Sequence, residues 1–415
     1  MKKILFSCLI LFSSITNASI NISDNNTDVV NLRDNCAGVI NCATTFEELL
    51  NWVWGTRQPS VNNPLLIDIG PGTFILQKSD GGYLKLCDGG SDVTFKGSGV
   101  DRTIISGSGG TLNLIPFVIT DAVIKVKDCN NLTFQDMSIK TKPNDVALGG
   151  ILGVGWIGGG NSVWNNVHIE SDYWAWVDLC SATGIPGKHK WFGSSLESLG
   201  GGAVNSVYRS DCALNLIHGS EFLTVRRPND NDLLEFFVAV EANTQNAQIQ
   251  LYGTSVRAIY PSNGSGSTSY KTTSITGLKA NDGGVIHMHG GIISVRSEHP
   301  GTFFNAIGAE VNNGGIIHTL ETAYGMKASG AGIIKRLVNN NGSISSPFQW
   351  SSSNTPPLIE SINGYDTFIE IDCDAAGDCS GNAPADSQHP HMMIYDNKCS
   401  LNGSWFDMVT NDCRK

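Results

Sequence analysis

Two stretches in the last third of the chain repeat one pattern. Each begins with glycines, continues with apolar pairs and a histidine, and ends with a cation, as in GGVIHMHGGIISVRS at 283–297 and NGGIIHTLETAYGMKAS at 313–329. The two histidines, His287 and His318, are 31 residues apart. A repeat of this length with β-like rather than helical periodicity is typical of a solenoid.

The same period extends through most of the chain. An apolar residue followed by one that is usually charged recurs at spacings of 30, 27, 29, 31, 39 and 31 residues, in the column Ile139, Ile169, Leu196, Val225, Val256, Val295 and Met326. Alternation within the segments, as in Met137 and Ile139, gives the period of two that a strand needs. We therefore expect this column to form an inward apolar ladder.

These repeats predict a parallel β-helix in which each repeat is one coil. Equivalent residues would then stack about 4.8 Å apart on successive coils, and insertions would fall in the turns. A β-sandwich would instead show strands every 8–12 residues or so without such a column. The fold class expected is therefore all-β, a right-handed parallel β-helix with a short N-terminal capping helix and a disulfide-rich C-terminal tail.

The two ends of the chain differ from the repeats. Residues 1–18 have the lysines, apolar run and small-residue ending of a secretory signal, so we expect an exported protein, extracellular or periplasmic. Residues 19–63 are expected to form a leader and N-terminal cap, in which Thr45 and Glu48 begin a short helix. The β-helix is expected over 64–345, and a C-terminal cap or appendage over 346–415. No segment after the signal is apolar enough over 18 residues to span a membrane.

Ten cysteines remain after the signal, and an even number in an exported chain predicts disulfides. Three pairs are close in sequence, namely Cys36 with Cys42, Cys373 with Cys379, and Cys399 with Cys413. The pairing of the other four, Cys87, Cys129, Cys180 and Cys212, is left open.

Several segments show a resemblance to a known superfamily. The segments IDIGPGTF, DVTFKGSGVDRTIISGSG, VIKVKDCNNLTFQDMSIKT and NSVWNNVHIES resemble the opening coils of pectin lyase-like right-handed β-helix proteins. That superfamily includes pectate lyases, pectin methylesterases, polygalacturonases, tailspikes and adhesins, so the resemblance implies a fold and not a reaction. The catalytic strings of its enzyme families are missing from this sequence.

The residues that follow the apolar column carry the most informative charges. In order they are Lys140, Glu170, Glu197, Arg226, Arg257, Arg296 and Lys327. Stacked carboxylates at Glu170 and Glu197 would repel one another, so they should bind a cation or raise one pKa. We take Glu170, Glu197 and Arg226 as candidate catalytic residues, and Glu170 and Glu197 as candidate Ca²⁺ ligands. The alternative is a solvated ladder in which Lys140 pairs with Glu170 and Glu197 with Arg226.

Residues for binding a substrate come from two features. Arg257 and Arg296 in the charged column would suit an extended polyanion. The insertion DYWAWVDLCSATGIPGKHKW adds aromatic and basic side chains, of which Trp174, Trp176, Lys188 and His189 are candidate substrate contacts. Packing in the core is the alternative for both tryptophans.

Histidines form a further pattern. His218, His287 and His318 occupy matching places in the alignment, with Gln250 between them. A histidine stack could bind a metal or act as a base. The alternative is an outward-facing ladder without chemistry.

Two classes of function are consistent with these observations. The first is a secreted protein that binds and degrades an acidic polysaccharide, as a lyase, esterase or glycoside hydrolase. The second is a non-catalytic adhesin or carbohydrate-binding protein. The net charge of −11 argues against nucleic acid as a partner, and the sequence leaves the oligomeric state open.

We predict at least four disulfides in the mature protein, among them Cys36–Cys42 and Cys373–Cys379. Peptide mapping of the exported protein by mass spectrometry without reduction should recover these linked peptides. A majority of free thiols would contradict the expectation.

Overall fold

The computed structural model describes most of the chain between residues 20 and 345, together with five short strands beyond it. The described ranges are 20–22, 24–76, 84–88, 91–107, 122–127, 129–141, 152–171, 173–180, 184–199, 204–225, 236–260, 274–297, 305–320, 322–329, 334–345, 359–362, 367–371, 392–396, 405–407 and 412–414. The expected signal at 1–18 lies outside them. Within these ranges no helix is both long and apolar enough to cross a membrane.

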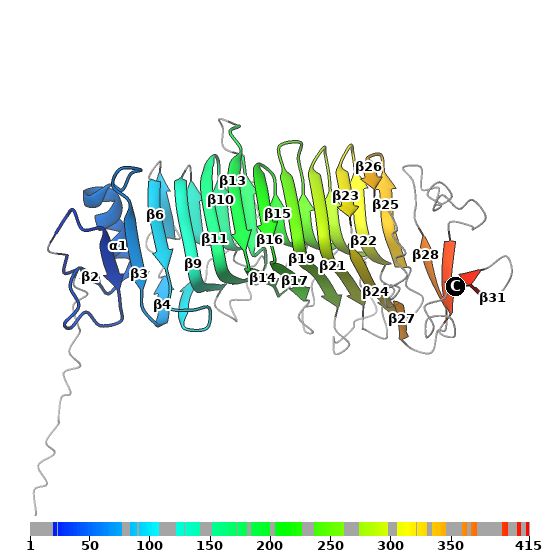
Figure 1. Cartoon of the computed structure of the whole chain (residues 1–415), viewed down its shortest axis with the longest axis horizontal. Helices are drawn as coiled ribbons and strands as arrows, with labels where there is room; N and C mark the ends of the chain where they lie inside the picture. The colour runs from blue at the N-terminus through cyan, green and yellow to red at the C-terminus, as the bar shows by residue number, and fades with distance from the viewer. Residues whose placement is uncertain are drawn as a thin grey trace, which may run out of the picture.

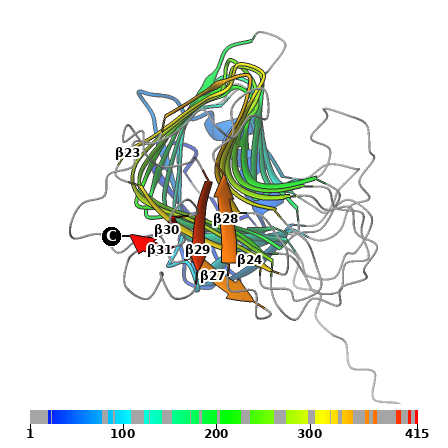
Figure 2. The same cartoon turned by 90° about the vertical axis from the view of Figure 1, so that its right-hand side faces the viewer.

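The chain winds into a right-handed parallel β-helix, which confirms the fold expected from the repeats (Figure 1). Viewed along the axis, the strands of successive coils lie over one another (Figure 2). Each complete coil has three strand segments. Equivalent segments of successive coils form three faces of the β-helix, which we call the first, second and third face in the order in which the chain reaches them.

The first and second faces belong to one hydrogen-bonded sheet. The first face holds β13 (Gly187–Phe192), β16 (Ala213–His218), β23 (Ile316–Leu320) and the first halves of β9 (Asn130–Thr141), β11 (Gly160–Ser171), β19 (Gln248–Tyr260) and β21 (Val285–Ser297). The second face holds β14 (Ser195–Ser198), β17 (Glu221–Val225), β24 (Ala323–Ser329) and the second halves of the same long strands.

The third face is a separate sheet. Its parallel strands are β5 (Leu84–Asp88), β8 (Ala122–Lys127), β10 (Leu152–Ile157), β12 (Trp176–Leu179), β15 (Val204–Ser210), β18 (Phe236–Ala242), β20 (Ser274–Ala280), β22 (Asn305–Asn312) and β25 (Ile334–Asn340). The side chains that the three faces turn inward form the core, which is continuous along the axis.

The bend between the first and second faces depends on one residue in each coil. That residue has a positive φ of 51° to 67° at Asp136, Asn166, Gly193, Gly219, Gly253 and Gly290. Glycine, asparagine and aspartate tolerate this left-handed conformation best, which explains their recurrence at this position. The bend turns the chain without breaking the ladder of backbone hydrogen bonds, so strands on both sides keep one register.

Asparagine side chains stabilise the turn after the third face. Asn312 Nδ2 donates to Asn281 Oδ1 at 2.9 Å, and Asn340 Nδ2 donates to Asn312 Oδ1 at 2.9 Å. Asn281 Nδ2 in turn donates to Asn243 Oδ1 at 3.2 Å. Each amide thus bonds the coil before it, which links successive turns through side chains that are half-buried or exposed.

The N-terminal end is closed by a cap. Helix α1 (Phe46–Trp52) begins at Thr45, whose Oγ1 accepts from the Glu48 backbone N–H at 3.4 Å, as the capping pattern predicts. A π-helical turn (Val53–Arg57) follows it. Strand β1 (Val29–Leu32) pairs with β2 (Cys42–Ala43) and in parallel with β3 (Leu65–Ile69), so the sheet already includes part of the expected leader.

The remaining early strands continue the coils. They are β4 (Gly72–Leu76), β6 (Ser91–Lys96) and β7 (Thr103–Gly107), which pair in parallel with one another or with β3 and β9. At the other end, β26 (Ser343–Ser345) and β27 (Ile359–Ile362) still stack in parallel. Strands β28 (Thr367–Ile371), β29 (Met392–Asp396), β30 (Trp405–Asp407) and β31 (Asp412–Arg414) pair antiparallel to one another.

Disulfides tie together neighbouring parts of the coils. Cys36–Cys42 is present as expected. Cys180 pairs with Cys212, which joins the ends of two successive third-face strands, and Cys129 is also disulfide-bonded. The expected pairs Cys373–Cys379 and Cys399–Cys413 lie outside the residues whose side chains are described.

Aromatic rings fill the core of the middle coils. Phe95, Phe134, Trp164 and Trp191 stack on successive coils, with ring centroids 5.0, 4.1 and 4.9 Å apart. All four are buried, and Trp164 is in register with Phe134, so both occupy core positions.

We predict that Trp164→Ala lowers the free energy of unfolding by about 3–5 kcal/mol, since it removes the middle of this stack and leaves a cavity. The midpoint of chemical denaturation measures the loss. Phe192→Ala is the control, because Phe192 follows Trp191 on β13 but faces outward and is 39% exposed. Equal losses in both variants would contradict the assignment of inward and outward positions.

Candidate functional site

A histidine and two glutamates meet on the second face. His168 and Glu170 are on β11, and Glu197 is on the neighbouring strand β14. Glu170 pairs in register with Glu197, while Ile169 and Leu196 beside them point into the core. The expected stacking of Glu170 on Glu197 is therefore present, because each follows a buried apolar residue by one position.

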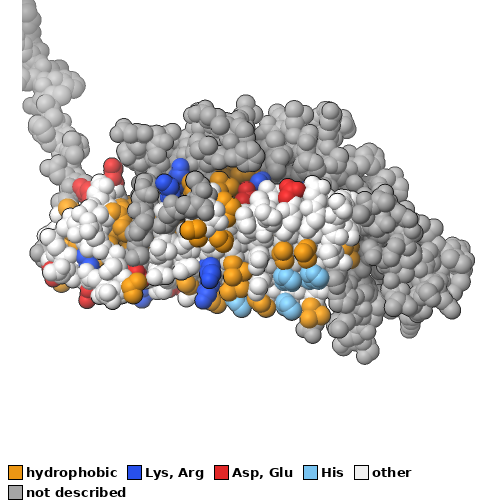
Figure 3. All heavy atoms as spheres, turned by 90° about the horizontal axis from the view of Figure 1, so that it is seen from above, with side chains coloured by type: hydrophobic (Ala, Val, Ile, Leu, Met, Phe, Trp, Pro, Cys, Tyr) orange, Lys and Arg blue, Asp and Glu red, His pale blue; other side chains and the backbone are white. Residues whose placement is uncertain are grey.

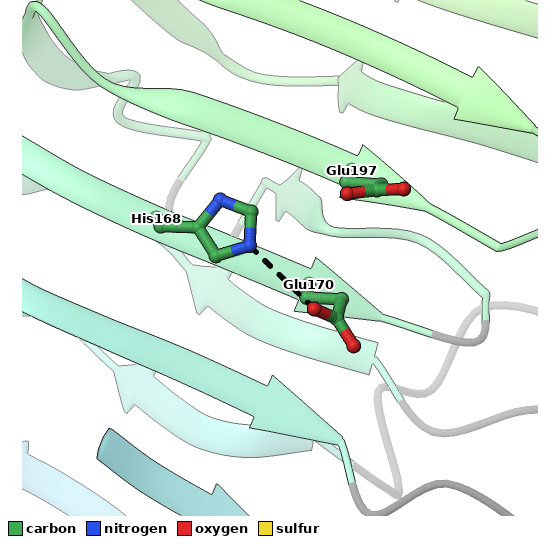
Figure 4. Close-up of side chains that lie close together, drawn as sticks. All are labelled: His168, Glu170 and Glu197. Atoms are coloured by element: carbon green, nitrogen blue, oxygen red, sulfur yellow. Dashed lines mark ion pairs between the residues drawn. The ribbon is translucent and has the colours of Figure 1, made fainter. Parts of the chain in front are cut away.

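His168 extends this pair into a group (Figure 4). Its side chain leaves the same face of β11 as Glu170, and its Nε2 is 3.6 Å from Glu170 Oε2. The other ring nitrogen, Nδ1, is 2.8 Å from Ser195 Oγ, which fixes the orientation of the ring. Lys140, one coil earlier, places its Nζ 3.1 Å from Glu170 Oε2.

The two glutamates differ in their electrostatic surroundings. The adjacent His168 lowers the pKa of Glu170 to about 2, and Lys140 adds to this effect against the opposing effect of burial. Glu197 has no hydrogen bond or ion pair among the described residues, and burial followed by repulsion from Glu170 raises its pKa. One carboxylate is therefore held ionised while its neighbour binds a proton more readily.

The same three side chains are the candidate metal ligands. One ligand atom each from His168, Glu170 and Glu197 lies within 4.8 Å of the other two. No other group of three or more histidine, cysteine, aspartate or glutamate residues in the described part of the chain meets this condition. The residues expected to bind a cation are thus close together, with a nitrogen ligand that the sequence interpretation did not include.

The predicted column is wrong at Val225, although Val256 lies in the row of Ile169 and Leu196 as expected. The residue next to Leu196 on the following coil is Phe222 and not Val225, and Glu197 therefore lies beside Leu223. Val225 is three positions further along the strand and is half-buried. Because Val225 and not Phe222 precedes a cation, the apolar-then-charged pattern selected the wrong residue of the strand.

This shift separates the predicted arginines. Arg226 lies outside the described residues, and its predecessor Val225 is not in the Glu170–Glu197 row. Arg257 follows Leu223 in that row, two coils beyond Glu197, but its Nη1 is 3.0 Å from Glu221 Oε1. Arg296 is next to Ile259 rather than Arg257, whereas its pairing with Lys327 is as expected.

The predicted aromatic and basic contacts do not join the group. Trp176 and His189 are both fully buried, so neither contacts a substrate. The His189 ring packs edge-on against Trp156 and Trp176, and burial lowers its pKa to about 3. Lys188 is exposed but belongs to the first face.

Trp174 is partly buried near the third face. Its indole lies 5.3 Å from the Arg209 guanidinium and 4.5 Å from the Tyr173 ring, so both of these groups already occupy its surroundings. Both tryptophans of this insertion therefore pack against the protein: Trp176 lies in the core, and Trp174 packs on the outer side of the third face. The sequence alone could not distinguish this from a sugar platform.

Another charged column, along the third face, was missed by sequence reasoning. Arg209, Glu241, Lys279 and Glu310 are in register on successive coils. Their signs alternate, and Lys279 Nζ is 3.8 Å from Glu310 Oε1. Each charge has an opposite neighbour, which makes this column a stabilising ladder, in contrast to the like charges of Glu170 and Glu197.

Comparisons with known proteins find similarity in fold alone. No protein-family model matches the chain, and no curated protein matches it. A pectin methylesterase from Erwinia chrysanthemi is 10% identical, with a TM-score of 0.36 over 80% of this chain and 92% of its own. A pectin methylesterase from carrot is 11% identical, with a TM-score of 0.35 over 84% and 90%.

A third similar structure is the A-module of a mannuronan C-5 epimerase from Azotobacter vinelandii. It is 11% identical, with a TM-score of 0.30 over 84% of this chain and 98% of the module. These proteins share the parallel β-helix architecture. Similarity at this level carries no information about the reaction.

We predict that Glu170→Gln destabilises the protein at pH 7 and less so in acid. The folded-state pKa of Glu170, about 2, is below its ordinary value of 4.5. The ionised carboxylate therefore stabilises the fold above pH 4.5, and this contribution is lost as the pH falls towards 2. Because the ion pairs are partly solvated, the loss at pH 7 should be on the order of 1 kcal/mol.

Denaturation midpoints of both proteins at pH 7 and pH 3 measure this difference. Glu221→Gln is the matched control, because Glu221 is in an ion pair with Arg257 on the same face but is 43% exposed. It should cost less at pH 7 than Glu170→Gln. A cost for Glu170→Gln that is the same at both pH values would contradict the role of its ion pairs.

Proposed function

We propose that the protein binds an acidic polysaccharide along the second face and catalyses proton transfer on it with Glu197. The observation that carries this proposal is the pair Glu170 and Glu197, whose pKa values are displaced in opposite directions. Neighbouring titratable groups with divergent pKa values are typical of sites that divide acid and base roles.

The geometry suits an extended ligand parallel to the axis. Lys140, Glu170, Glu197, Leu223 and Arg257 form one outward row on five successive coils. With coils about 4.8 Å apart, the row is about 19 Å long and has a cation at each end. Lys140 and Arg257 would attract carboxylates of a polyuronide on either side of the glutamates, and such contacts would add through their effective concentration.

The roles of the two glutamates follow from their surroundings. Glu170 stays ionised and holds His168 and Lys140 in place. Glu197, which has the raised pKa and no partner among the described residues, is the group that would remove or donate a proton. In a lyase reaction Glu197 would take the proton next to a uronate carboxylate, and a cation near that carboxylate would stabilise the resulting charge. The C4–O bond would then break to form a C4–C5 double bond, and the leaving oxygen would gain a proton from water or from Glu197.

The alternative for the same three residues is that His168, Glu170 and Glu197 bind a divalent cation, in which case Glu197 would be a ligand and not the base. The carboxylates supply the oxygen ligands that Ca²⁺ prefers, whereas an imidazole nitrogen suits Zn²⁺. An ion there would add positive charge beside the carboxylate of a bound sugar. The effect of a chelator and of Ca²⁺ or Zn²⁺ added back tests which ion is needed.

The test is an assay of the purified protein on polygalacturonate, methylated pectin and alginate, with a neutral glycan as control. Unsaturated product, methanol and reducing ends would identify a lyase, an esterase and a hydrolase. We expect product from an acidic glycan, and a rate reduced by about 10²–10⁴-fold in Glu197→Gln. As Glu197 would act in its ionised form, the rate should rise with pH through its raised pKa.

Glu310→Gln, on the third face, should retain the parent rate. Undiminished turnover in Glu197→Gln would refute the catalytic role of that residue. Binding of acidic glycans without any product would instead support a carbohydrate-binding protein or adhesin, and absence of binding to every acidic glycan would exclude both readings of the second face.

A further inference from the structure

Three histidines gather on the first face, away from the Glu170–Glu197 group. His287 and His289 are on β21 on either side of Met288, whose side chain is fully buried, so both imidazoles leave the outer surface. His318 on β23 is in register with His287. Figure 3 shows histidine side chains gathered on this face beside hydrophobic ones, apart from the acidic side chains in view.

These positions correct the sequence alignment of the histidines. His287 is in register with Gln250 and His318, as expected. His218, however, is next to Tyr252 and therefore belongs to the row of His289. The group of neighbours is thus His287, His289 and His318, and it includes a residue that the repeated pattern had left aside.

The rings on this face are arranged in parallel stacks. The imidazoles of His287 and His318 are 5.2 Å apart with an interplanar angle of 9°. In the adjacent row Phe192, His218, Tyr252 and His289 are stacked at angles of 10° to 11°. Stacked rings cover one another's faces and present their edges to solvent, which disfavours stacking of a sugar and leaves ring nitrogens accessible.

The group offers the ring nitrogens of three imidazoles as ligands. None of the three histidines is in an ion pair with a carboxylate within the described part of the chain. Burial, and then the neighbouring His318 and His289, lower the pKa of His287, which favours its neutral form. His289 and His318 are exposed, so an ion can approach from solvent.

We propose that His287, His289 and His318 bind a divalent transition-metal ion, with Zn²⁺ as the ion to test first. Alternate residues on one strand are about 6.6 Å apart, and paired residues on adjacent strands are about 4.8 Å apart. This triangle brings three imidazoles within reach of one point above the sheet once their side chains rotate. Three histidine nitrogens with a fourth position open to solvent form one of the common zinc coordination sets.

Binding requires rotation of the side chains but no movement of the backbone. The parallel rings have to turn about their Cα–Cβ and Cβ–Cγ bonds until three nitrogens converge, since the three ligand atoms are not within 4.8 Å of one another now. All three Cβ atoms stand on hydrogen-bonded strands of one sheet, so the backbone that presents them is fixed. Imidazole ligands suit Zn²⁺, Cu²⁺ and Ni²⁺, and hard cations such as Ca²⁺ should not bind here.

The test is a calorimetric titration of the full-length protein with Zn²⁺ after removal of metal by a chelator. We expect His318→Asn and His287→Asn each to weaken one equivalent of binding by at least about tenfold, as loss of a ligand should exceed the 10–100-fold effect known for outer-shell partners. His218→Asn is the matched control, because His218 is exposed on the same face but lies two coils before β21 and three before β23. It should bind Zn²⁺ as the parent does.

His168→Asn separates this site from the group on the second face. If the equivalent lost in His318→Asn is retained in His168→Asn, the two sites are distinct and the proposal is supported. If instead Zn²⁺ binding is unchanged in His318→Asn and His287→Asn, or is lost in His168→Asn alone, the proposal is wrong.

Imidazole nitrogen NMR shifts give a readout that is independent of affinity. Zn²⁺ should shift the signals of His287, His289 and His318 together, and leave that of His218 in place. Shifts confined to other histidines would overturn the assignment.

Discussion

The register between successive coils is the interaction on which the rest of the structure depends. Each strand is hydrogen-bonded to the equivalent strand of the next coil, so every side chain has a neighbour of known identity about 4.8 Å above and below it. Like residues therefore meet like residues wherever the sequence repeats. This stacks apolar groups in the core, asparagine amides in the turns, and imidazoles on the outside.

The same fixed register holds two carboxylates side by side on the second face, where they repel one another. Glu170 and Glu197 cannot move apart, because Ile169 and Leu196 beside them are held in the core. His168 and Lys140 relieve the charge of Glu170, and Glu197 is left with a raised pKa. Where charges alternate in sign, as along the third face, the same stacking leads to mutual neutralisation instead. The pKa shifts of these carboxylates therefore depend on which signs the repeat brings together.

The repeat period and the inward ladder could be predicted from the sequence because both follow from local alternation and spacing. Ile139, Ile169 and Leu196 are in register and buried as expected. The positions of Val225 and Val295 in the rows could not be predicted, because the coils differ in length and each strand carries several apolar residues of similar character. His168 could have been predicted as a third member of the group, since it precedes Glu170 by two positions on a strand and must share its face. Burial of Trp176 and His189 depended on ring packing between coils, which no single segment reveals.

Four buried tryptophans are concentrated in a few middle coils, so the near-ultraviolet optical signals of the protein should come mainly from that part of the β-helix. Trp156, Trp164, Trp176 and Trp191 are all fully buried, and the centroid distances that link each to its neighbours run from 4.9 to 6.2 Å. Indoles this close couple electronically, so near-ultraviolet circular dichroism of the folded protein should be dominated by them. A solenoid can fray at its ends while its middle stays intact. Such a signal would follow the middle coils and remain unchanged while the last coils open and close.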